Sequence, residues 1–279
     1  RKELNLSRGI ITKKFNINPG TYDSWFNKNN IPFYRFKQII EASGKSLDLI
    51  KNKVKFTIIT SSKSVKFPDS TSDDLMELYG FLSGDGWIDK YGLKFSNFDK
   101  EVIERYNLLV KKVFNVEAFN CIVGRQDHCS KLLKLFFEKI FNFPLKAKSS
   151  NLCLPDFVFK CPDSEIASFI RGLFDCDSHI DKNKKDIQIT LASEKLIKQL
   201  QFLLLRFGIV SRFSEKIKYA TNTIEKIKRT YYSLSISGYE NLFLYNKYIG
   251  FNLIKKKQCL KQHLKSKIKS NTNVDVIPC

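Results

Sequence analysis

The first 50 residues show apolar positions at helical spacing in three short stretches that are separated by turn residues. The turn segment 18–20 ends the first stretch, Thr21 can cap the second, and the segment 29–32 precedes the third. We therefore expect a helix-turn-helix-like DNA-binding module over 1–50, although any three-helix bundle has similar spacing. A linker over 51–72 would follow it. The side chains expected to face a DNA groove are Thr21, Tyr22, Ser24 and Lys28.

The remainder of the chain contains one pattern of elements twice. Segments 75–85 and 167–177 are both compatible with a helix, have glycine at the same place and end in aspartate. A strand pair, an amphipathic helix with a polar N-cap, further strands and a closing helix follow each segment. This order, αββαββα repeated, predicts an α+β fold with two pseudo-symmetric halves. The expected boundaries are 73–160 for the first half, 161–265 for the second half and 266–279 for a basic tail.

The two repeated helices carry small residues four positions apart, on one face of each helix. Such residues let two helix backbones approach closely. The other positions are mostly apolar, which is typical of an interior or an interface. If the helices pair about a two-fold axis, Asp85 and Asp177 emerge side by side at one end. The matched small residues are Gly80 with Gly172 and Gly84 with Cys176.

Charge narrows the class of partner. The chain of 279 residues has 48 Lys and Arg against 28 Asp and Glu, which gives a net charge of +20. Such an excess attracts polyanions through salt-sensitive phosphate contacts, so it favours nucleic-acid binding over the alternative of a merely basic protein. Because no apolar run reaches the roughly 18 residues of a membrane span and no signal peptide is evident, we expect no membrane partner. We expect an intracellular protein of the cytoplasm or nucleoid, and a fragment of a longer chain.

The cysteines and histidines do not indicate a zinc site. Seven cysteines, an odd number with no C-x-x-C pair, argue against a disulfide framework and favour reduced thiols. We interpret Asp127-His128-Cys129 as accidental neighbours in a loop rather than as metal ligands.

The aspartate pair predicts chemistry of its own. Two adjacent carboxylates repel each other unless a cation lies between them. Hard divalent cations such as Mg²⁺ prefer oxygen ligands and can activate water for an in-line attack on phosphate. We therefore expect Asp85 and Asp177 to hold Mg²⁺ or Mn²⁺, with Gly84 and Cys176, which directly precede them, in the same metal site. The alternative is that each aspartate simply ends its helix.

Two segments carry a family resemblance. LYGFLSGDG (78–86) and IRGLFDCDS (170–178) resemble the two motifs of LAGLIDADG homing endonucleases. The flanking LLLRFGI (203–209) and SGYENLFLYNKYIGF (237–251) are similar to members of this family found inside inteins. The resemblance covers about residues 55–260.

This resemblance implies a site-specific endonuclease, acting as a monomer, that cuts double-stranded DNA at a long asymmetric target. In this family the last acidic residue of each motif holds catalytic metal, which corresponds to Asp85 and Asp177. A basic residue after the last helix of each half often assists the active site. Lys148 matches that residue in the first half, and Lys256 is our choice among Lys255–Lys257 in the second.

The motifs depart from the family pattern at two places. Ser83 stands where the first motif often has another aspartate, and Ser178 replaces the last glycine of the second motif, which we expect to reshape the second site. A DNA-binding regulator without catalysis and an RNA maturase stay open as alternatives to the nuclease.

The resemblance also implies that two four-stranded sheets form a saddle over the major groove. Strand alternation gives each sheet a polar face with donors for base edges and phosphates, although an ordinary solvated face has the same pattern. The expected DNA contacts are Lys90, Lys94, Ser96, Arg125, Lys182, Gln188, Thr190, Arg212, Lys216, Lys218, Arg229, Ser233 and Ser235.

Overall fold

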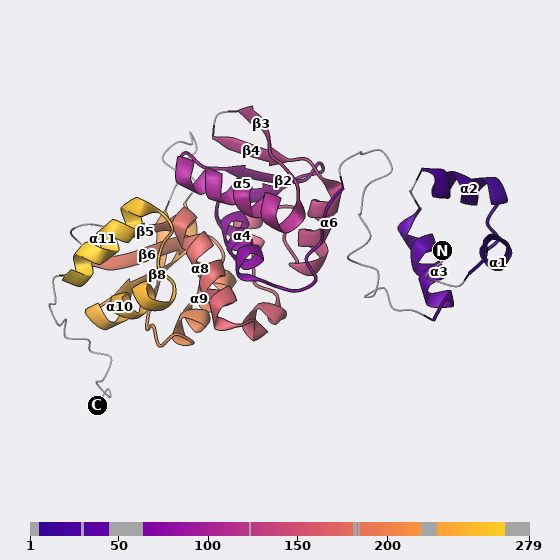
Figure 1. Ribbon diagram of the computed structural model, residues 1–279. Coiled ribbons are helices and arrows are strands. Elements are labelled where there is room, and N and C mark those ends of the chain that lie inside the picture. The colour runs from indigo at the N-terminus through magenta and orange to yellow at the C-terminus, as the bar shows by residue number, and fades with distance from the viewer. Residues whose placement is uncertain are drawn as a thin grey trace. The chain divides into compact units, whose positions relative to one another are not determined.

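The computed structural model separates the chain into two units, residues 1–56 and 57–279, each of which is described by itself (Figure 1). The expected tail 266–279, most of the expected linker and Lys182 lie outside the residues that the structure describes. The described residues are 6–28, 31–44, 64–122, 124–180, 183, 185–218 and 228–265.

The first unit consists of three short helices. Asn18 caps the second helix by accepting a hydrogen bond from the Gly20 N–H at 2.8 Å, and Pro19 occupies its first turn. The expectation that Thr21 caps this helix is therefore wrong, because Asn18 is the cap and Thr21 already lies inside the helix. The helices are α1 (Arg8–Lys14), α2 (Pro19–Asn27) and α3 (Phe33–Ala42).

A small apolar core joins these helices. Tyr22 is only 8% exposed and packs in this core with Ile11, Ile17 and Ile39. The expectation that Tyr22 faces a DNA groove is therefore wrong, since its ring fills the centre of the bundle. The other residues expected there are Thr21 and Lys28, which are exposed, and Ser24, which is half-buried.

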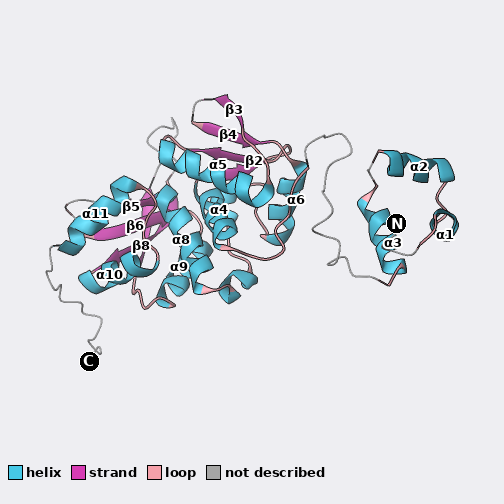
Figure 2. Ribbon diagram, in the orientation of Figure 1, coloured by secondary structure: helices cyan, strands magenta, loops and turns pink. Residues whose placement is uncertain are grey.

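The second unit has the predicted order αββαββα twice, and the α+β class is confirmed (Figure 2). Its first half comprises α4 (Asp73–Gly84), β1 (Gly86–Ile88), β2 (Leu93–Ser96), α5 (Lys100–Phe114), β3 (Phe119–Ile122), β4 (Arg125–His128) and α6 (Lys131–Ile140). A short helix α7 (Lys148–Asn151) and a 3₁₀ helix (Asp156–Lys160) lead into the second half. That half comprises α8 (Asp163–Asp177), β5 (Ser178–Ile180), β6 (Asp186–Leu191), α9 (Glu194–Leu205), β7 (Arg212–Lys218), β8 (Arg229–Ser237), α10 (Tyr239–Tyr248) and α11 (Ile254–Lys265).

Polar caps start the main helices of both halves. Asp99 accepts from the N–H of Glu101 and so begins α5, as its position before an amphipathic stretch predicts. Ser193 accepts from the N–H of Leu196 and begins α9 in the same way. The helices therefore start where the local sequence supplies an acceptor for otherwise unpaired backbone N–H groups.

Each half contains one antiparallel four-stranded sheet, with strand orders β1-β2-β4-β3 and β5-β6-β8-β7. The register matches as well, because Gly86 pairs with Phe95 in the first sheet and Ser178 pairs with Ile189 in the second. Helices pack on one face of each sheet, as α9 does against β6, β7 and β8. The opposite faces carry the polar positions of the strands.

A single apolar core extends through both halves. Val65 is buried in this core, and the N–H of Lys66 donates to the Phe114 carbonyl at 2.9 Å. The packed unit thus begins before residue 73, inside the segment that we expected to be linker. Among the described residues, no helix has the length and apolar character needed to cross a membrane.

Candidate metal site and nucleic-acid surface

Helices α4 and α8 pack against each other at glycine positions. A Cβ atom added to Gly80 would lie 2.2 Å from the Phe169 carbonyl oxygen. A Cβ added to Gly172 would lie 2.3 Å from the Glu77 carbonyl oxygen. Both distances are far below van der Waals contact, and the obstructing atoms are backbone, so these glycines permit the close approach that the sequence predicts.

The next small-residue pair lies one turn further along and is asymmetric. A Cβ added to Gly84 would lie 2.6 Å from the Cβ of Cys176 and 3.3 Å from Oδ2 of Asp177. The cysteine side chain therefore occupies the space that Gly84 leaves open. Burial, reinforced by the carboxylates of Asp85 and Asp177, raises the pKa of the Cys176 thiol well above its usual value. The thiol stays protonated, and only the backbone carbonyl of Cys176 is suited to bind a cation.

Asp85 and Asp177 come together at the end of this helix pair. Asp85 follows the last residue of α4, and Asp177 is the last residue of α8. Burial first, and then the charge of Asp85, raises the pKa of the Asp177 carboxyl to about 6. The Asp85 carboxylate is thus close enough to Asp177 to disfavour ionisation of the Asp177 carboxyl.

Lys148 lies at the end of α4. Its Nζ donates to the carbonyl oxygens of Leu82 at 3.3 Å and Gly86 at 2.7 Å, and also to that of Gly84. Burial lowers the pKa of Lys148, and the nearby carboxylates of Asp177 and Asp85 oppose that shift. The ammonium group is therefore held by backbone oxygens beside the aspartate pair.

Lys256 holds the corresponding position at the end of α8. Its Nζ donates to the carbonyl oxygens of Phe174 at 2.7 Å, Asp175 at 2.9 Å and Ser178 at 2.6 Å. Burial lowers its pKa too, again against the pull of nearby carboxylates. Its neighbours Lys255 and Lys257 are exposed. Of the three lysines considered from sequence, Lys256 is the one that lies at the aspartate pair.

Ser178 fits its position without backbone strain. It adopts φ −86° and ψ 154°, and its Oγ donates to the Phe174 carbonyl at 2.6 Å. At the matching position, a Cβ on Gly86 would lie 2.6 Å from the Cα of Leu82. α8 therefore leaves room for a side chain where α4 does not, and Ser178 Oγ also accepts a hydrogen bond from Lys256 Nζ at 3.4 Å. That Ser178 reshapes the second site stays a prediction.

Two residues beside the site, Asn97 and Asp175, were not predicted from the sequence. Asn97 Nδ2 donates to Oδ2 of Asp85 at 2.6 Å, whereas Leu191 holds the matching place in the second half. Asp175 is buried next to Cys176 and accepts hydrogen bonds from backbone N–H groups in the segment that leads to α11. The acidic residue inside IRGLFDCDS and the polar residue that follows β2 were the available signals.

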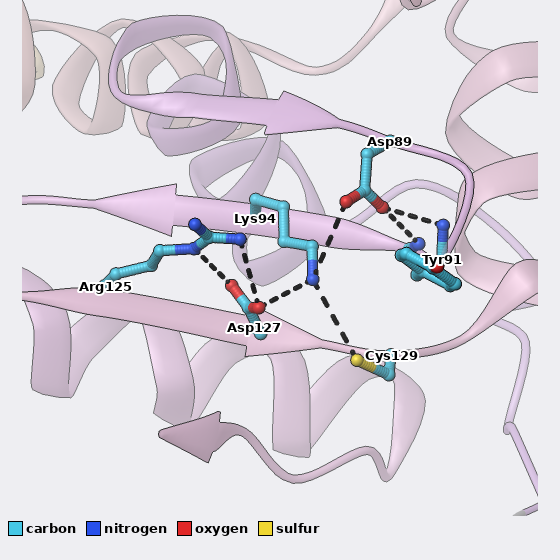
Figure 3. Close-up of polar contacts among 7 residues, drawn as sticks. Asp89, Tyr91, Lys94, Arg125, Asp127 and Cys129 are labelled. Carbon is cyan, nitrogen blue, oxygen red and sulfur yellow. Dashed lines mark hydrogen bonds and ion pairs between the residues drawn. The ribbon is translucent and has the colours of Figure 1, made fainter. Parts of the chain in front are cut away.

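The polar face of the first sheet carries an ion-paired cluster (Figure 3). Lys94 Nζ lies 2.7 Å from Oδ2 of Asp127 and 3.8 Å from Oδ2 of Asp89. Arg125 donates through Nε to Oδ1 of the same Asp127 at 2.8 Å, and its guanidinium lies 5.4 Å from the ring centre of Trp87. Burial raises the pKa of Asp127, but the bonds from Arg125 and Lys94 outweigh it and lower the pKa overall. The cations on this face are thus paired within the protein.

Two sequence expectations need correction here. Lys94 is 3% exposed, so it is wrong as a free DNA contact, because Asp127 and Asp89 enclose its ammonium. Asp127 and His128 lie in strand β4 rather than in a loop. His128 is fully buried, and burial lowers its pKa to about 4. Its ring packs edge-on against Tyr106, with 5.4 Å between the ring centres.

The polar face of the second sheet has a different character. Register places Arg212 opposite Ser235 and Lys216 opposite Tyr231. Among the described residues, Arg212, Lys216 and Arg229 make no ion pair. Ser233 is fully buried and donates to the Ile189 carbonyl at 3.2 Å, so its expected role as a DNA contact is wrong.

The other residues of the expected DNA surface are at least partly accessible. Exposed side chains belong to Lys90, Arg212 and Arg229, and half-buried ones to Ser96, Arg125, Gln188, Thr190, Lys216 and Ser235. Lys218 ends strand β7, but its side chain lies outside the described set. Gln188 and Thr190 lie opposite Ser235 and Ser233 in β8, so these polar positions share one face.

The donor set at the helix ends suits a hard cation. Among the described residues, no three His, Cys, Asp or Glu side chains are grouped so that they could hold a metal ion. The carboxylates of Asp85 and Asp177 and the backbone carbonyls of Gly84 and Cys176 are all oxygen donors. A site with only two carboxylates resembles those that bind Mg²⁺ together with water and substrate phosphate.

Comparison with known proteins gives matches to parts of larger proteins. The chain is 38% identical over 194 residues to the glutamine–fructose-6-phosphate aminotransferase (isomerizing) of Methanocaldococcus jannaschii, covering 67% of this chain and 17% of that protein. It is 30% identical over 217 residues to the probable translation initiation factor IF-2 of Thermococcus kodakarensis, covering 75% of this chain and 17% of that protein. The chain thus spans only 17% of the length of each of these relatives.

Solved structures with a similar arrangement share little sequence with this chain. Full-length DUF199/WhiA from Thermatoga maritima has 16% identity and a TM-score of 0.48, covering 74% of this chain and 64% of that one. A mesophilic variant of the homing endonuclease I-DmoI has 17% identity and a TM-score of 0.45, covering 63% of this chain and 95% of that one. At the level of sequence, residues 164–250 match the family model of a LAGLIDADG-like domain. The second half of this chain therefore contains a LAGLIDADG-like domain.

Proposed function

We propose that this chain is a site-specific endonuclease that cuts both strands of DNA with the help of Mg²⁺ or Mn²⁺. The observation that carries the proposal is the aspartate pair. Asp85 and Asp177 lie at the ends of two helices whose glycines allow backbone contact, and each helix end holds its own half-buried lysine. A protein that only binds DNA has no need to hold two carboxylates together against their repulsion.

The carboxylates of Asp85 and Asp177 are metal ligands in this proposal. The backbone carbonyls of Gly84 and Cys176 are the remaining ligands that the protein provides. A divalent cation bound there would neutralise the carboxylates and stabilise negative charge that develops on the scissile phosphate. The raised pKa of Asp177, which burial and Asp85 cause, fits a site built for a cation. Asn97 orients the Asp85 carboxylate through its hydrogen bond.

Lys148 and Lys256 supply positive charge on either side of the aspartate pair. Each ammonium is fixed by carbonyl oxygens at one helix end, so its position is set before DNA arrives. A preorganised cation stabilises a phosphoryl transition state better than a mobile one, because it needs no reorganisation during the reaction. The two lysines would thus serve the two strands in corresponding ways.

The polar sheet faces are the proposed DNA-binding surface. The net charge of +20 favours phosphate contacts, and the side chains of Gln188 and Thr190 can donate to base edges. The two sheets present different residues at matched positions, so the target is expected to be asymmetric. Thr21 and Lys28 of the first unit would add contacts outside this surface.

The relatives support the proposal that this chain is an inserted segment of a larger protein. An aminotransferase and a translation initiation factor have unrelated roles, yet 17% of each protein is similar to this chain. A segment that occurs in such different proteins is best explained as an insertion. We therefore propose that the chain is an endonuclease encoded within an intein.

The proposal is tested by selection from a pool of DNA duplexes with a randomised segment, incubated with the protein and Mg²⁺. We expect wild-type protein to enrich one cleaved sequence. We expect Asp85→Asn and Asp177→Asn to lose at least about 10³-fold in cleavage rate on that sequence, equal to roughly 4 kcal/mol, since each removes an anionic metal ligand.

Binding without cleavage is the outcome that contradicts the nuclease. Tight binding by wild-type protein with no cut product in Mg²⁺ or Mn²⁺ would favour a DNA-binding regulator. Preference for structured RNA over all duplexes would favour a maturase. Full activity of Asp85→Asn would show that Asp85 is not a required metal ligand, and the proposal of a nuclease would still stand.

A further inference from the structure

The start of α11 is held by carboxylates from two other helices. The N–H of Lys257 donates to the Leu253 carbonyl at 2.9 Å, so the N–H groups just before this point have no partner within the helix. The N–H groups of Asn252 and Leu253 donate to the Asp175 carboxylate at 3.1 and 3.4 Å. The N–H of Ile254 donates to Oε2 of Glu101 at 3.1 Å.

These acceptors are chemically well matched to their donors. The first turn of a helix presents unpaired N–H groups and a partial positive charge, both of which favour a carboxylate. Asp175 is 2% exposed, so water does not compete for its oxygens. A buried carboxylate is stable only if it is hydrogen-bonded, and the N–H groups of Asn252 and Leu253 supply those bonds.

The first half of the unit also contributes to this contact. Asn252 Nδ2 donates to Oε1 of Glu77, a buried residue of α4, at 2.8 Å. Arg105 of α5 donates to both carboxylate oxygens of Glu77, at 2.8 and 2.7 Å. The segment before α11 is therefore connected to α4 and α5 as well as to α8.

Lys256 lies in the first turn of the helix that this network holds. Its Nζ reaches the Asp175 and Ser178 carbonyls, which mark the end of α8. A shift of the 252–254 backbone would move Lys256 with it. On the basis of the proposed nuclease function, we infer that Asp175 is a positioning residue that, with Glu101, holds α11 so that Lys256 reaches the metal site.

Among its described residues, the first half has no such arrangement. Ser83 stands at the position that matches Asp175, and Lys148 belongs to a helix of only four residues, after Ala147 with a φ of +47°. Lys148 is thus placed without a carboxylate from its own motif. Loss of the Asp175 contact should therefore displace Lys256 more than Lys148. As a result, the cutting of one DNA strand should be slowed more than the cutting of the other strand.

The test uses the full chain and a supercoiled plasmid carrying the sequence selected from the randomised pool. We expect Asp175→Asn to slow single-turnover cleavage of one strand by about 10- to 100-fold. This is the usual effect of removing a residue that supports a metal site without binding the metal. Nicked plasmid should accumulate, while the Kd for a duplex of the same sequence stays unchanged. Glu101→Gln should give a smaller strand bias in the same direction. Ser83→Ala is the matched control and should cut both strands as wild type does.

Amide hydrogen exchange of residues 252–254 provides a readout that does not depend on cleavage. Exchange should become faster in Asp175→Asn and stay unchanged in Ser83→Ala. Equal slowing of both strands, a parallel rise in Kd or unchanged exchange would overturn the inference. If Asp175→Asn does not fold, Glu101→Gln decides by the same measurements. If wild-type protein cuts no DNA, the proposed function fails, and hydrogen exchange still tests whether Asp175 holds the segment.

Discussion

The two halves of the second unit differ most at the residues that surround their aspartates. Asp85 receives a hydrogen bond from Asn97, whereas Leu191 stands at the matching position near Asp177. Conversely, Asp175 holds the segment before α11, whereas Ser83 stands in its place in α4. The helix pair and the sheets keep one backbone plan, because packing constrains them. The polar residues around the two aspartates differ between the halves. Asn97 bonds to the aspartate of the first half, whereas Asp175 holds the segment that carries the lysine of the second half.

The sheet faces extend this comparison. In the first sheet Lys94 and Arg125 are paired with Asp127, so positive charge is largely neutralised inside the protein. In the second sheet Arg212 and Lys216 have no ion-pair partner among the described residues. Electrostatic attraction to DNA should therefore come mainly from the second sheet.

The cores beneath the sheets differ as well. Register pairs Leu93 with His128 in the first half and Ile187 with Ile236 in the second. A buried histidine thus stands where the second half has a buried isoleucine. Within the described part of the chain, neither ring nitrogen of His128 has a hydrogen-bond partner. The first half therefore contains a titratable group in its core at a place where the second half is apolar.

The largest effect should come from the feature that the halves share. Gly80→Ala and Gly172→Ala should each lower the free energy of unfolding by about 3 kcal/mol, because the added methyl group would meet backbone of the other helix. Urea denaturation monitored by circular dichroism measures this change. Gly9→Ala is the control, since a Cβ there meets nothing within 4 Å. A clearly unequal effect of the two substitutions would show that the interface is less symmetric than its glycines suggest.

The next effect separates the two cores. The pKa of His128 is lowered to about 4 by burial, so between about pH 6.5 and pH 4 the unfolded chain binds a proton that the folded chain excludes. Stability is therefore lost as pH falls through this range, by up to about 3 kcal/mol for this group. His128→Ile, which copies Ile236, should remove that part of the acid sensitivity in thermal or urea unfolding. His179→Gln, a change at an exposed side chain of β5, should retain the wild-type profile. Equal acid sensitivity of wild type and His128→Ile would contradict the prediction.

The smallest effect separates the two sheet faces. Arg212→Ala and Lys216→Ala should each reduce the slope of log K against log salt concentration by about 0.9, the value for one lost phosphate contact. Lys94→Met should leave the slope unchanged, since the Lys94 ammonium is already paired with Asp127. Fluorescence anisotropy with a duplex of the selected sequence, at several salt concentrations, measures the slope. The same reduction from Lys94→Met as from Arg212→Ala would mean that the first sheet opens its ion pairs on binding DNA.

Features with a local or periodic origin could be predicted from sequence. The doubled order αββαββα follows from apolar periodicity, and Asp99 and Ser193 cap helices because each supplies a side-chain acceptor close to the first turn. The approach of Asp85 to Asp177 follows from small residues repeated at one helix face, since backbone contact is possible only where side chains are absent.

Features that depend on contacts between distant segments could not be predicted in this way. Strand alternation places Lys94 on a polar face, but only the pairing of β2 with β4 encloses it beside Asp127. Tyr22 looks like a surface residue of a recognition helix until α1 and α3 cover it. Alternation defines the face of a strand, whereas burial on that face depends on what the neighbouring segments supply.

The sequence by itself determined the repeat, the helix pair and the two aspartates at its end, because periodicity and side-chain size act locally. Only the tertiary structure decided which lysine lies at the second aspartate and what holds it there. Asp175 and Asn252 are far apart along the chain, and their hydrogen bond forms only when α8 and the segment before α11 pack together. A hydrogen bond between distant residues depends on the whole fold, which no local pattern of residues encodes.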